Sequence, residues 1–438
     1  MVAAIPTAPV ISQYVVSRLR ESVFNSSDVN TTRRVCGEHG NLTADDRLDQ
    51  EVQKHAASLN LYYSLVGSLS AIVINIFIGP LSDSIGRRFM FISPLLGILT
   101  KNVIITFIVY FKLDTNYFYL ANLIDGLSGS YFAMLVAIFA YTADITVPGK
   151  PRTIAMAVME GCLPVAASIG LLSTGFLIKS TGFFYPMVLF VTLGALDLVV
   201  VFFLLPETRV TKTLDRSPLK SLRKVFGFYF TEDTVQKRIL YAIAMGIFFF
   251  SVVTVLGRSA LETIYQLGKP FCWDSVKIGY FGALRTTSMV IFSVTVIKIL
   301  HRCLQEEVIG IISCLSAIAG FLLQGVANTS LLMYLAPIAG VVSGATTPIA
   351  RSIMSRLTSP SQQGALFASI AVVEAVCHST SNLLYNAVYN ATVDYYKGIV
   401  WFFMAGMALV DLLLLLIFRL MPRKGTGITL GLELVTKL

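Results

Sequence analysis

Eight ionisable side chains fall inside long apolar runs of this 438-residue chain, where charge is otherwise rare. They are Asp125, Asp144, Glu160, Arg258, Glu262, Arg285, Arg351 and Glu374. A charged group in a membrane-spanning helix costs about 3 kcal/mol or more unless it is paired or hydrated, so such groups are candidates for function. Because both signs occur, the set could supply an anion contact from an arginine and a proton carrier from a carboxylate.

The arginines suit anion binding, because a guanidinium can donate two parallel hydrogen bonds to one carboxylate or phosphate. Arg285 is a candidate for such a contact, and Arg258 is a second. Arg258 and Glu262 are four residues apart, so the alternative is that they neutralise each other on one helix face. Asp125 precedes two glycines that permit close helix contact, and we expect it to be paired locally. Glu374 is a candidate proton carrier.

The elements that carry these residues follow from composition. Apolar side chains make up 55% of the chain and charged ones 13%, whereas soluble domains have about 25% charged residues. A helix crosses a bilayer with roughly 20 apolar residues, and the runs do not alternate as strands would. The predicted fold is an all-α membrane protein with spans near 58–80, 90–112, 116–142, 152–178, 184–206, 239–266, 277–300, 306–327, 330–357, 363–389 and 397–421. Residues 1–16 are predicted to be the last turns of a first span whose beginning is missing.

The charge distribution and the cysteines exclude several classes of function. The net charge is +9, but the basic residues gather in short connections between apolar runs, as membrane topology requires, rather than over a face that could bind nucleic acid. The six cysteines form no CxxC pair, and the four histidines form no HExxH pair. We therefore expect no metal site, no cofactor, no catalytic residues and no enzyme activity.

Two independent signals orient the chain in the membrane. Residues 17–57 form a predicted outside loop that contains three glycosylation sequons, at Asn25, Asn30 and Asn41. The connections placed inside by the same topology carry Arg and Lys pairs such as Arg87 and Arg88, in agreement with the positive-inside rule.

A basic connection at 207–238 divides the spans into two sets of about six. The predicted organisation is an N-terminal helical bundle over 1–206, a cytoplasmic linker over 207–238, a C-terminal bundle over 239–421 and a cytoplasmic tail over 422–438. Two similar halves around a central linker are typical of secondary transporters, in which the substrate binds between the halves near the membrane midplane.

The connection "GPLSDSIGRR" at 79–88 has the spacing G-x-x-x-D-x-x-G-R-R. It resembles the loop between the second and third spans of the major facilitator superfamily, and "LPET" at 205–208 is a weaker feature of the same kind. The resemblance implies that Asp83, Arg87 and Arg88 act in gating, by holding one access state. Asp83 and Arg87 are four residues apart and can pair on one helix face.

Four further segments narrow the resemblance. "FAYTADI" (139–145), "KPFCWDSVKIGYFGA" (269–283), "PIARSIMSRL" (348–357) and "QQGALFASIAVVEA" (362–375) together resemble solute carrier family 46, which includes the proton-coupled folate transporter. The resemblance implies twelve helices in two bundles, both ends in the cytoplasm, and proton-driven uptake of organic anions. It also implies a disulfide between Cys36 and Cys272, which the oxidising outside permits.

The same resemblance implies roles for three of the buried charges. Glu160 matches the proton-coupling acid of the fifth span, and the alternative is a permanent ion pair with an arginine. Arg351 matches an arginine of the tenth span that is tied to substrate and proton binding, and a structural ion pair is the alternative. Asp144 matches an acid at the inner end of the fourth span, as a gating or structural residue.

The chain also departs from the folate transporter. Its central linker has no histidine, Val255 stands where the seventh span of that protein has one, and Asn122 replaces an arginine of the fourth span. These departures are compatible with transport of other anions, such as muropeptides or cyclic dinucleotides.

We predict a secondary active transporter, a proton-coupled symporter of a small organic anion in the plasma or endolysosomal membrane. The alternative is a non-transporting membrane receptor or scaffold with the same fold.

Overall fold

The computed structural model describes residues 6–24, 44–146, 150–208, 235–256, 258–300, 303–358 and 363–421, and these residues are organised as helices without strands. The N-terminal half contains α1 (Thr7–Phe24), α3 (Ala44–Ile85), α4 (Arg87–Phe111), α5 (Tyr117–Leu127), α6 (Ser130–Ile145), α7 (Lys150–Thr181) and α8 (Phe184–Leu204). The C-terminal half contains α10 (Val235–Val255), α11 (Ser259–Leu267), α12 (Ser275–Leu300), α13 (Glu306–Val326), α14 (Ser330–Ala339), the short 3₁₀ turn η1 (Ser343–Ala345), α15 (Thr346–Leu357), α16 (Gln363–Thr392) and α17 (Ile399–Leu420).

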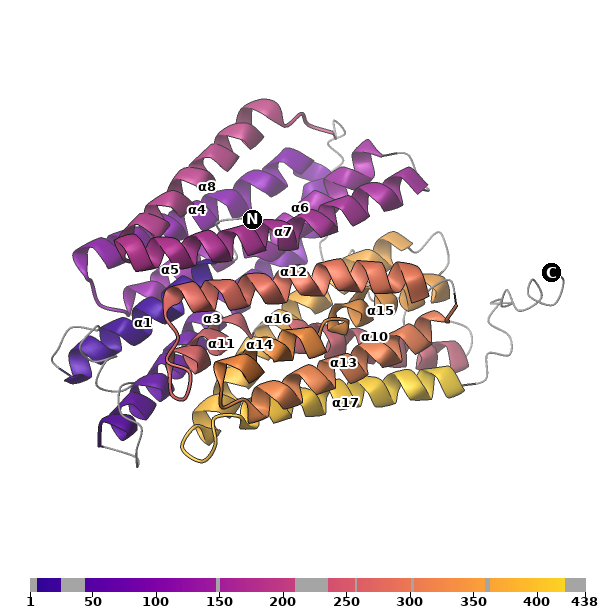
Figure 1. The fold of residues 1–438 in the computed structure, drawn as a ribbon. Helices are drawn as coiled ribbons and strands as arrows, with labels where there is room; N and C mark the ends of the chain where they lie inside the picture. Colours follow the sequence, from indigo (N-terminus) through magenta and orange to yellow (C-terminus); the bar gives the residue numbers. More distant parts are fainter. Residues whose placement is uncertain are drawn as a thin grey trace.

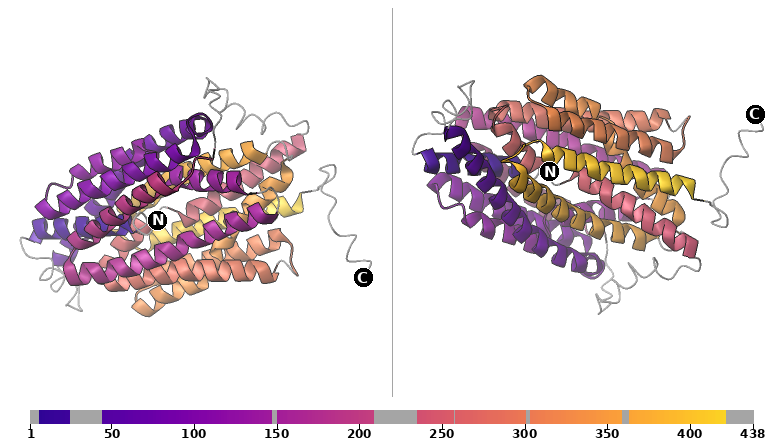
Figure 2. Two further views of the ribbon diagram at one scale, coloured as in Figure 1. Left: turned by 90° about the horizontal axis from the view of Figure 1, so that it is seen from above. Right: turned by 90° about the horizontal axis from the view of Figure 1, so that it is seen from below.

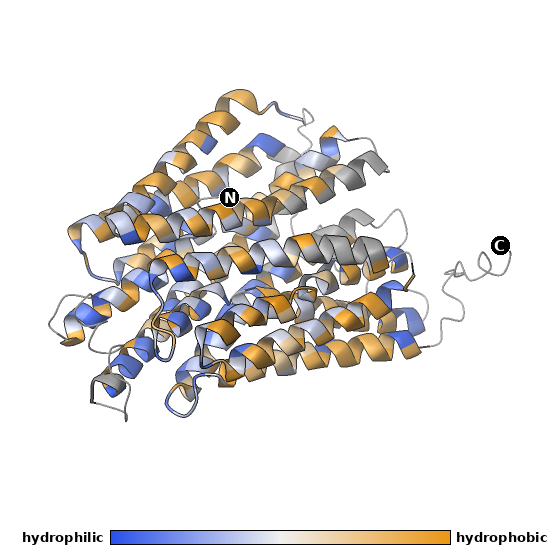
Figure 3. Ribbon diagram, viewed as in Figure 1, coloured by the Kyte–Doolittle hydropathy of each residue, from blue (hydrophilic) through white to orange (hydrophobic). Residues whose placement is uncertain are grey.

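The helices have the length and composition of membrane spans. Within the described residues, nine helical stretches are long and apolar enough to cross a bilayer. The predicted spans 277–300 and 363–389 correspond to α12 and α16. In α8 only 17% of the apolar window is buried, and Phe203 and Leu204 are each more than 70% exposed. Figure 3 shows hydrophobic residues along the helix bodies and hydrophilic residues gathered near the helix ends. The outward faces of the helices are therefore suited to lipid.

The boundaries differ from the predicted ones at the first connection. Helix α1 continues to Phe24 and α3 begins at Ala44, so helix occupies both ends of the loop predicted at 17–57. A helix can project beyond the bilayer wherever its polar residues are hydrated, which a count of apolar residues does not detect. The sequons at Asn25, Asn30 and Asn41 lie outside the described residues, as do 209–234 of the linker and the tail from 422.

The two halves lie side by side. In Figure 1 most of the N-terminal helices lie above the C-terminal ones, and in the right-hand view of Figure 2 most of them lie below. They meet mainly along two helix pairs, α7 with α12 and α3 with α16, and α11 also packs against α1 and α3. Between α7 and α12 the backbones are in close contact, because a Cβ on Gly175 would lie 2.6 Å from the carbonyl oxygen of Ser275. Small residues allow such approach in membranes, where packing rather than the hydrophobic effect holds helices together.

Hydrogen bonds across the two halves concentrate at one end of the bundle, which the predicted orientation places outside and which we call the outer end. Its connections are 112–116, 182–183, 268–274, 327–329 and 393–398. Gln53 of α3 is central there: its Oε1 accepts from Tyr389 at 2.9 Å and from Lys397 at 3.1 Å. Arg20 of α1 donates to Asp49 at 3.0 Å and to the Leu267 carbonyl at 3.1 Å. The outer end is therefore closed in this structure.

Three spans are interrupted near the middle of the bundle. The fourth span breaks at Gly129, whose φ of 91° suits glycine, between α5 and α6. In the seventh span α10 ends at Val255 and α11 begins at Ser259, and the tenth span breaks at 340–345 between α14 and α15. Interrupted helices at membrane depth are tolerated where the backbone is buried in protein or lines a cavity, and they often mark binding sites.

Candidate substrate cavity

A cavity of about 380 Å³ lies between the two halves at the level of the helix breaks. Its walls come from both halves: α1, α3, α4, α5, α6 and α7 on one side, and the α10–α11 break, α12 and α16 on the other. Among the described residues, the charged groups that line it are Lys101, Asp125, Arg258 and Arg285. This volume is within the range of ligand sites, which is roughly 300–1,000 Å³.

The C-terminal wall contains an ion pair between α11 and α12. Arg285 donates to one oxygen of the Glu262 carboxylate, and the Gln324 amide donates to the other at 3.0 Å. Glu262 is only 3% exposed, and each oxygen of its carboxylate accepts one of these hydrogen bonds. The alternative that Arg258 and Glu262 neutralise each other stays open in part: Glu262 attracts Arg258 electrostatically, but its hydrogen bonds come from Arg285 of α12 and Gln324 of α13.

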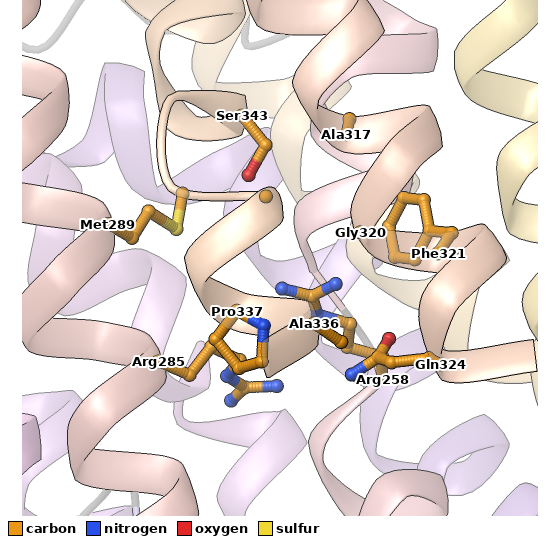
Figure 4. Close-up of a pocket in the computed structure, with 11 residues that line it drawn as sticks. Arg258, Arg285, Met289, Ala317, Gly320, Phe321, Gln324, Ala336, Pro337 and Ser343 are labelled. Atoms are coloured by element: carbon orange, nitrogen blue, oxygen red, sulfur yellow. The ribbon is translucent and has the colours of Figure 1, made fainter. Parts of the chain in front are cut away.

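Arg258 precedes α11 in the seventh span, and within the described part of the chain it forms no direct ion pair, although Glu262 attracts it electrostatically. Its guanidinium lies over the Phe321 ring at 5.2 Å, and its Nε has no hydrogen-bond partner among the described residues. Figure 4 shows the Arg258 and Arg285 guanidinium groups and the Gln324 amide around one small pocket of about 30 Å³. Because Arg285 and Glu262 cancel, the C-terminal wall retains one positive charge, that of Arg258.

The N-terminal wall contains a second pair, between α4 and α5. Lys101 donates to Asp125 Oδ2 at 2.9 Å, and Ser130 donates to the same oxygen at 3.1 Å. Asp125 is thus paired, but with a neighbouring helix rather than with its own. Sequence analysis missed Lys101, although a lysine inside the apolar run 90–112 was itself a signal.

The eleventh span contributes His378, which sequence analysis also did not single out. His378 lines the cavity, its ring lies 4.9 Å from that of Phe132, and its Nδ1 has no partner among the described residues. One turn earlier on α16, Glu374 accepts a hydrogen bond from Arg351 of α15 at 2.7 Å. Two predicted site residues therefore pair with each other. Neither is among the described residues that line the cavity.

The predicted gating residues meet at the inner end of the N-terminal half. Arg87 Nε donates to Asp144 Oδ2 at 2.7 Å. The Glu207 carboxylate of the "LPET" segment accepts from the backbone N–H groups of Arg87 at 2.7 Å and Arg88 at 3.1 Å, at the start of α4. An acidic group at a helix N-terminus satisfies unpaired donors and complements the helix dipole. Sequence analysis missed this role of Glu207.

The structure describes some of the remaining predicted residues and leaves others undescribed. Arg88 lies over the Phe202 ring at 5.0 Å. The side chains of Asp83 and Glu160 lie outside the described residues, so their pairing stays a prediction. Cys272 is disulfide-bonded, and Cys36 lies outside the described residues, so the pairing of these two cysteines also stays a prediction. No group of three or more metal-ligating side chains occurs among the described residues.

Comparison with known proteins identifies the fold. Residues 48–381 match the sequence profile described as Major Facilitator Superfamily. This chain belongs to that superfamily. The superfamily comprises transporters, so the protein is a multi-pass membrane transporter and not an enzyme.

Curated relatives extend over nearly the whole chain. A lysosomal proton-coupled steroid conjugate and bile acid symporter, SLC46A3 of Gallus gallus, is 29% identical over 93% of this chain and 89% of its own length. The proton-coupled folate transporter of Bos taurus is 29% identical over 94% of this chain and 88% of its own length. The resemblance to solute carrier family 46 is therefore confirmed by similarity along both halves.

Solved structures of the superfamily share the fold. A D-xylose–proton symporter aligns with a TM-score of 0.64 at 13% identity, covering 97% of this chain and 98% of that chain. The human organic anion transporter TETRAN aligns with a TM-score of 0.59 at 18% identity, covering 94% and 98%. These likenesses support two bundles of superfamily type around a central cavity.

Proposed function

We propose that this protein is a secondary active transporter that moves an organic anion together with protons, and that the anionic group of the substrate binds at Arg258. The observation that carries the proposal is that Arg258 lines the central cavity, while its Nε has no hydrogen-bond partner among the residues that the structure describes. The relatives named as proton-coupled symporters of steroid conjugates, bile acids and folate support the same class of substrate and coupling ion.

The charge balance explains why an anion is the expected ligand. A charge buried without a counter-ion is unfavourable by several kcal/mol, even after the protein relaxes. Arg285 and Glu262 form a direct ion pair, whereas Arg258 stacks on the Phe321 ring and shares the attraction of Glu262 with Arg285, so two guanidinium groups face one carboxylate. A carboxylate, sulfate or phosphate in the cavity would complete the pairing, with two parallel hydrogen bonds to the guanidinium.

The helix break adds to this preference. Arg258 is the residue that precedes α11, so the first N–H groups of that helix lie beside it. Unpaired N–H groups and the positive end of the helix dipole favour an anion at this position. Transporters with discontinuous helices use such half-helix ends to bind anionic groups of their substrates.

Proton coupling is assigned to carboxylates within the bundle. Glu374 is paired with Arg351, and protonation of Glu374 would remove the charge of its carboxylate from that ion pair. Glu160 remains the other candidate carrier. Both groups could load a proton from the acidic side and release it on the other side, so that the anion and the proton move in the same direction.

Uptake into liposomes tests the proposal. Purified full-length protein is reconstituted, and uptake of folate, lithocholate, muramyl dipeptide and a cyclic dinucleotide is measured with the outside made acidic. We expect at least one anion to accumulate above its external concentration, and a protonophore to abolish the accumulation. If none of these anions accumulates while the reconstituted protein remains folded, the proposal is wrong and the receptor or scaffold alternative is favoured.

A further inference from the structure

Several buried polar atoms of residues that line the cavity have no hydrogen-bond partner among the described residues. They are Asn102 Nδ2, Asn102 Oδ1, Asp125 Oδ1 and His378 Nδ1. Asn102 is the extreme case: it is 1% exposed, it lines the cavity, and neither end of its amide is bonded. Most buried side-chain polar atoms in proteins have at least one partner, so a cluster of this kind requires an explanation.

Side-chain contacts connect the helices that carry these atoms. Asn102 follows Lys101 on α4, and Lys101 bonds the other oxygen of Asp125 on α5. Ser130 at the start of α6 bonds the same Asp125 oxygen, and two residues later Phe132 contacts His378 of α16. Asn102 and Asp125 therefore line the cavity from the N-terminal half, whereas His378 and Arg258 line it from the C-terminal half.

The chemistry of the N-terminal wall differs from that of the Arg258 wall. Lys101 and Asp125 neutralise each other, so the N-terminal wall has no excess charge to attract an ion. An asparagine amide presents two donor hydrogens and an acceptor oxygen at the same place. Each buried polar group left without a partner costs about 1–3 kcal/mol, which a bound group that both donates and accepts would recover.

We propose that Asn102 forms a second subsite, which binds a neutral hydroxyl or amide group at the end of the substrate away from its anionic group. This inference rests on the proposed function, since it assumes that Arg258 holds the anionic end. The cavity then selects an amphipathic anion with a charged group at one end and an uncharged hydrogen-bonding group at the other. Asn102 is a specificity-determining residue, and Arg258 supplies the charge recognition.

Two related bile acids provide the test, because a relative is named for bile acid transport. Lithocholate has one ring hydroxyl, at the end opposite its carboxylate, and cholanoate is the same anion without that hydroxyl. We expect the wild-type protein to bind lithocholate about tenfold more tightly than cholanoate, since the analogue leaves the amide unpaired. Asn102→Leu should reduce this ratio to about one, mainly by weakening lithocholate binding.

A matched control is available at Asn122, which also lines the cavity. Its Nδ2 already donates to the Phe118 carbonyl of its own helix at 2.8 Å, so Asn122→Leu should leave the binding ratio unchanged. Thermal stability without ligand gives a second measurement. Because the Asn102 amide is unpaired, Asn102→Leu should melt at the same temperature as the wild type or higher.

The outcomes separate this inference from the proposed function. If both bile acids bind equally to the wild type, or if Asn102→Leu preserves the preference for lithocholate, the Asn102 subsite is wrong even where acid-driven anion uptake occurs. A lower melting temperature of Asn102→Leu also overturns it, by indicating that the amide has a structural partner. If no anion binds and none accumulates, the proposed function fails and the inference fails with it.

Discussion

The glycine pair at which α7 and α12 cross controls the closed outer end, and alanine substitution there should open it. A Cβ on Gly175 would lie 2.6 Å from the Ser275 carbonyl oxygen, and a Cβ on Gly279 would lie 2.9 Å from the Leu171 carbonyl oxygen. Ordinary van der Waals contacts of a Cβ begin at 3.4 Å. Since both obstacles are backbone atoms, the helices must separate.

The magnitude follows from the packing. Overpacking a close interface costs about 1–3 kcal/mol, which corresponds to roughly a 5- to 150-fold shift in a two-state equilibrium. Gly175→Ala should therefore populate the state in which the outer ends of the halves are apart. The intrinsic preference of alanine over glycine in a helix is about 1 kcal/mol in the stabilising direction, so a change in helix stability alone would not open the interface.

Spin labels at the outer end measure this shift. Leu113 in the N-terminal half and Tyr395 in the C-terminal half are both exposed, at 38% and 86%. The exposed cysteines Cys162 and Cys303 are first replaced by serine, and spin labels are attached at positions 113 and 395. In Gly175→Ala the distribution of distances between the two labels should contain an additional population at longer distance. The control is Gly406→Ala on α17, where a Cβ would meet nothing within 4 Å. Identical distance distributions in the wild type and both variants would refute the reasoning.

Three further predictions concern the inner end, the outer end and the coupling residues. Gly86 has a φ of 116°, and a Cβ added there would lie 2.5 Å from Glu207 Oε2. Gly86→Ala should therefore destabilise the protein by about 1–3 kcal/mol, which is measured as a lower melting temperature in detergent. An unchanged melting temperature contradicts the prediction. Burial raises the pKa of Asp274, but hydrogen bonds from the Lys277 backbone and Lys179, with the charges of both lysines, outweigh it and hold that pKa below the ordinary 3.8. The stabilisation from a lowered carboxylate pKa is present at pH values above 3.8 and is lost only as the pH falls through the lowered pKa. Asp274→Asn should therefore change the distance between the outer-end spin labels by the same amount at neutral and at mildly acidic pH. A change in that distance that depends on pH in this range counts against the prediction. Glu374→Gln should flatten the pH dependence of uptake, since the residue paired with Arg351 can no longer gain a proton, and a wild-type pH profile would remove Glu374 from the coupling.

Local sequence was sufficient for the predictions that depend on composition and short motifs. Apolar runs predicted the spans because the bilayer requires about 20 apolar residues for each crossing. The G-x-x-x-D-x-x-G-R-R spacing and the charges within spans indicated Arg87, Asp144, Arg258 and Arg285. The structure places the first two in one ion pair and the last two on one cavity wall.

The partners of these charges depend on tertiary packing and could not be predicted in the same way. Glu262 is four residues from Arg258, yet its hydrogen-bond donors are Arg285 and Gln324, 23 and 62 residues away. A break in a helix changes which side chains face each other, and neither periodicity nor spacing locates a break such as the one between α10 and α11. His378 and Asn102 were overlooked for a related reason: a single polar residue in an apolar run is informative only once its neighbours are known.

The central claim is that Arg258 supplies the uncompensated positive charge that binds the substrate, and the most direct test measures charge selectivity. Binding of lithocholate and of its uncharged amide is compared in wild type and Arg258→Gln. Because hydrogen bonds to a charged group contribute about 1.5–3 kcal/mol, we predict that the wild type prefers the anion by about tenfold to a hundredfold and that Arg258→Gln loses this preference. An Arg258→Gln protein that still prefers the anion to the same extent would contradict the account.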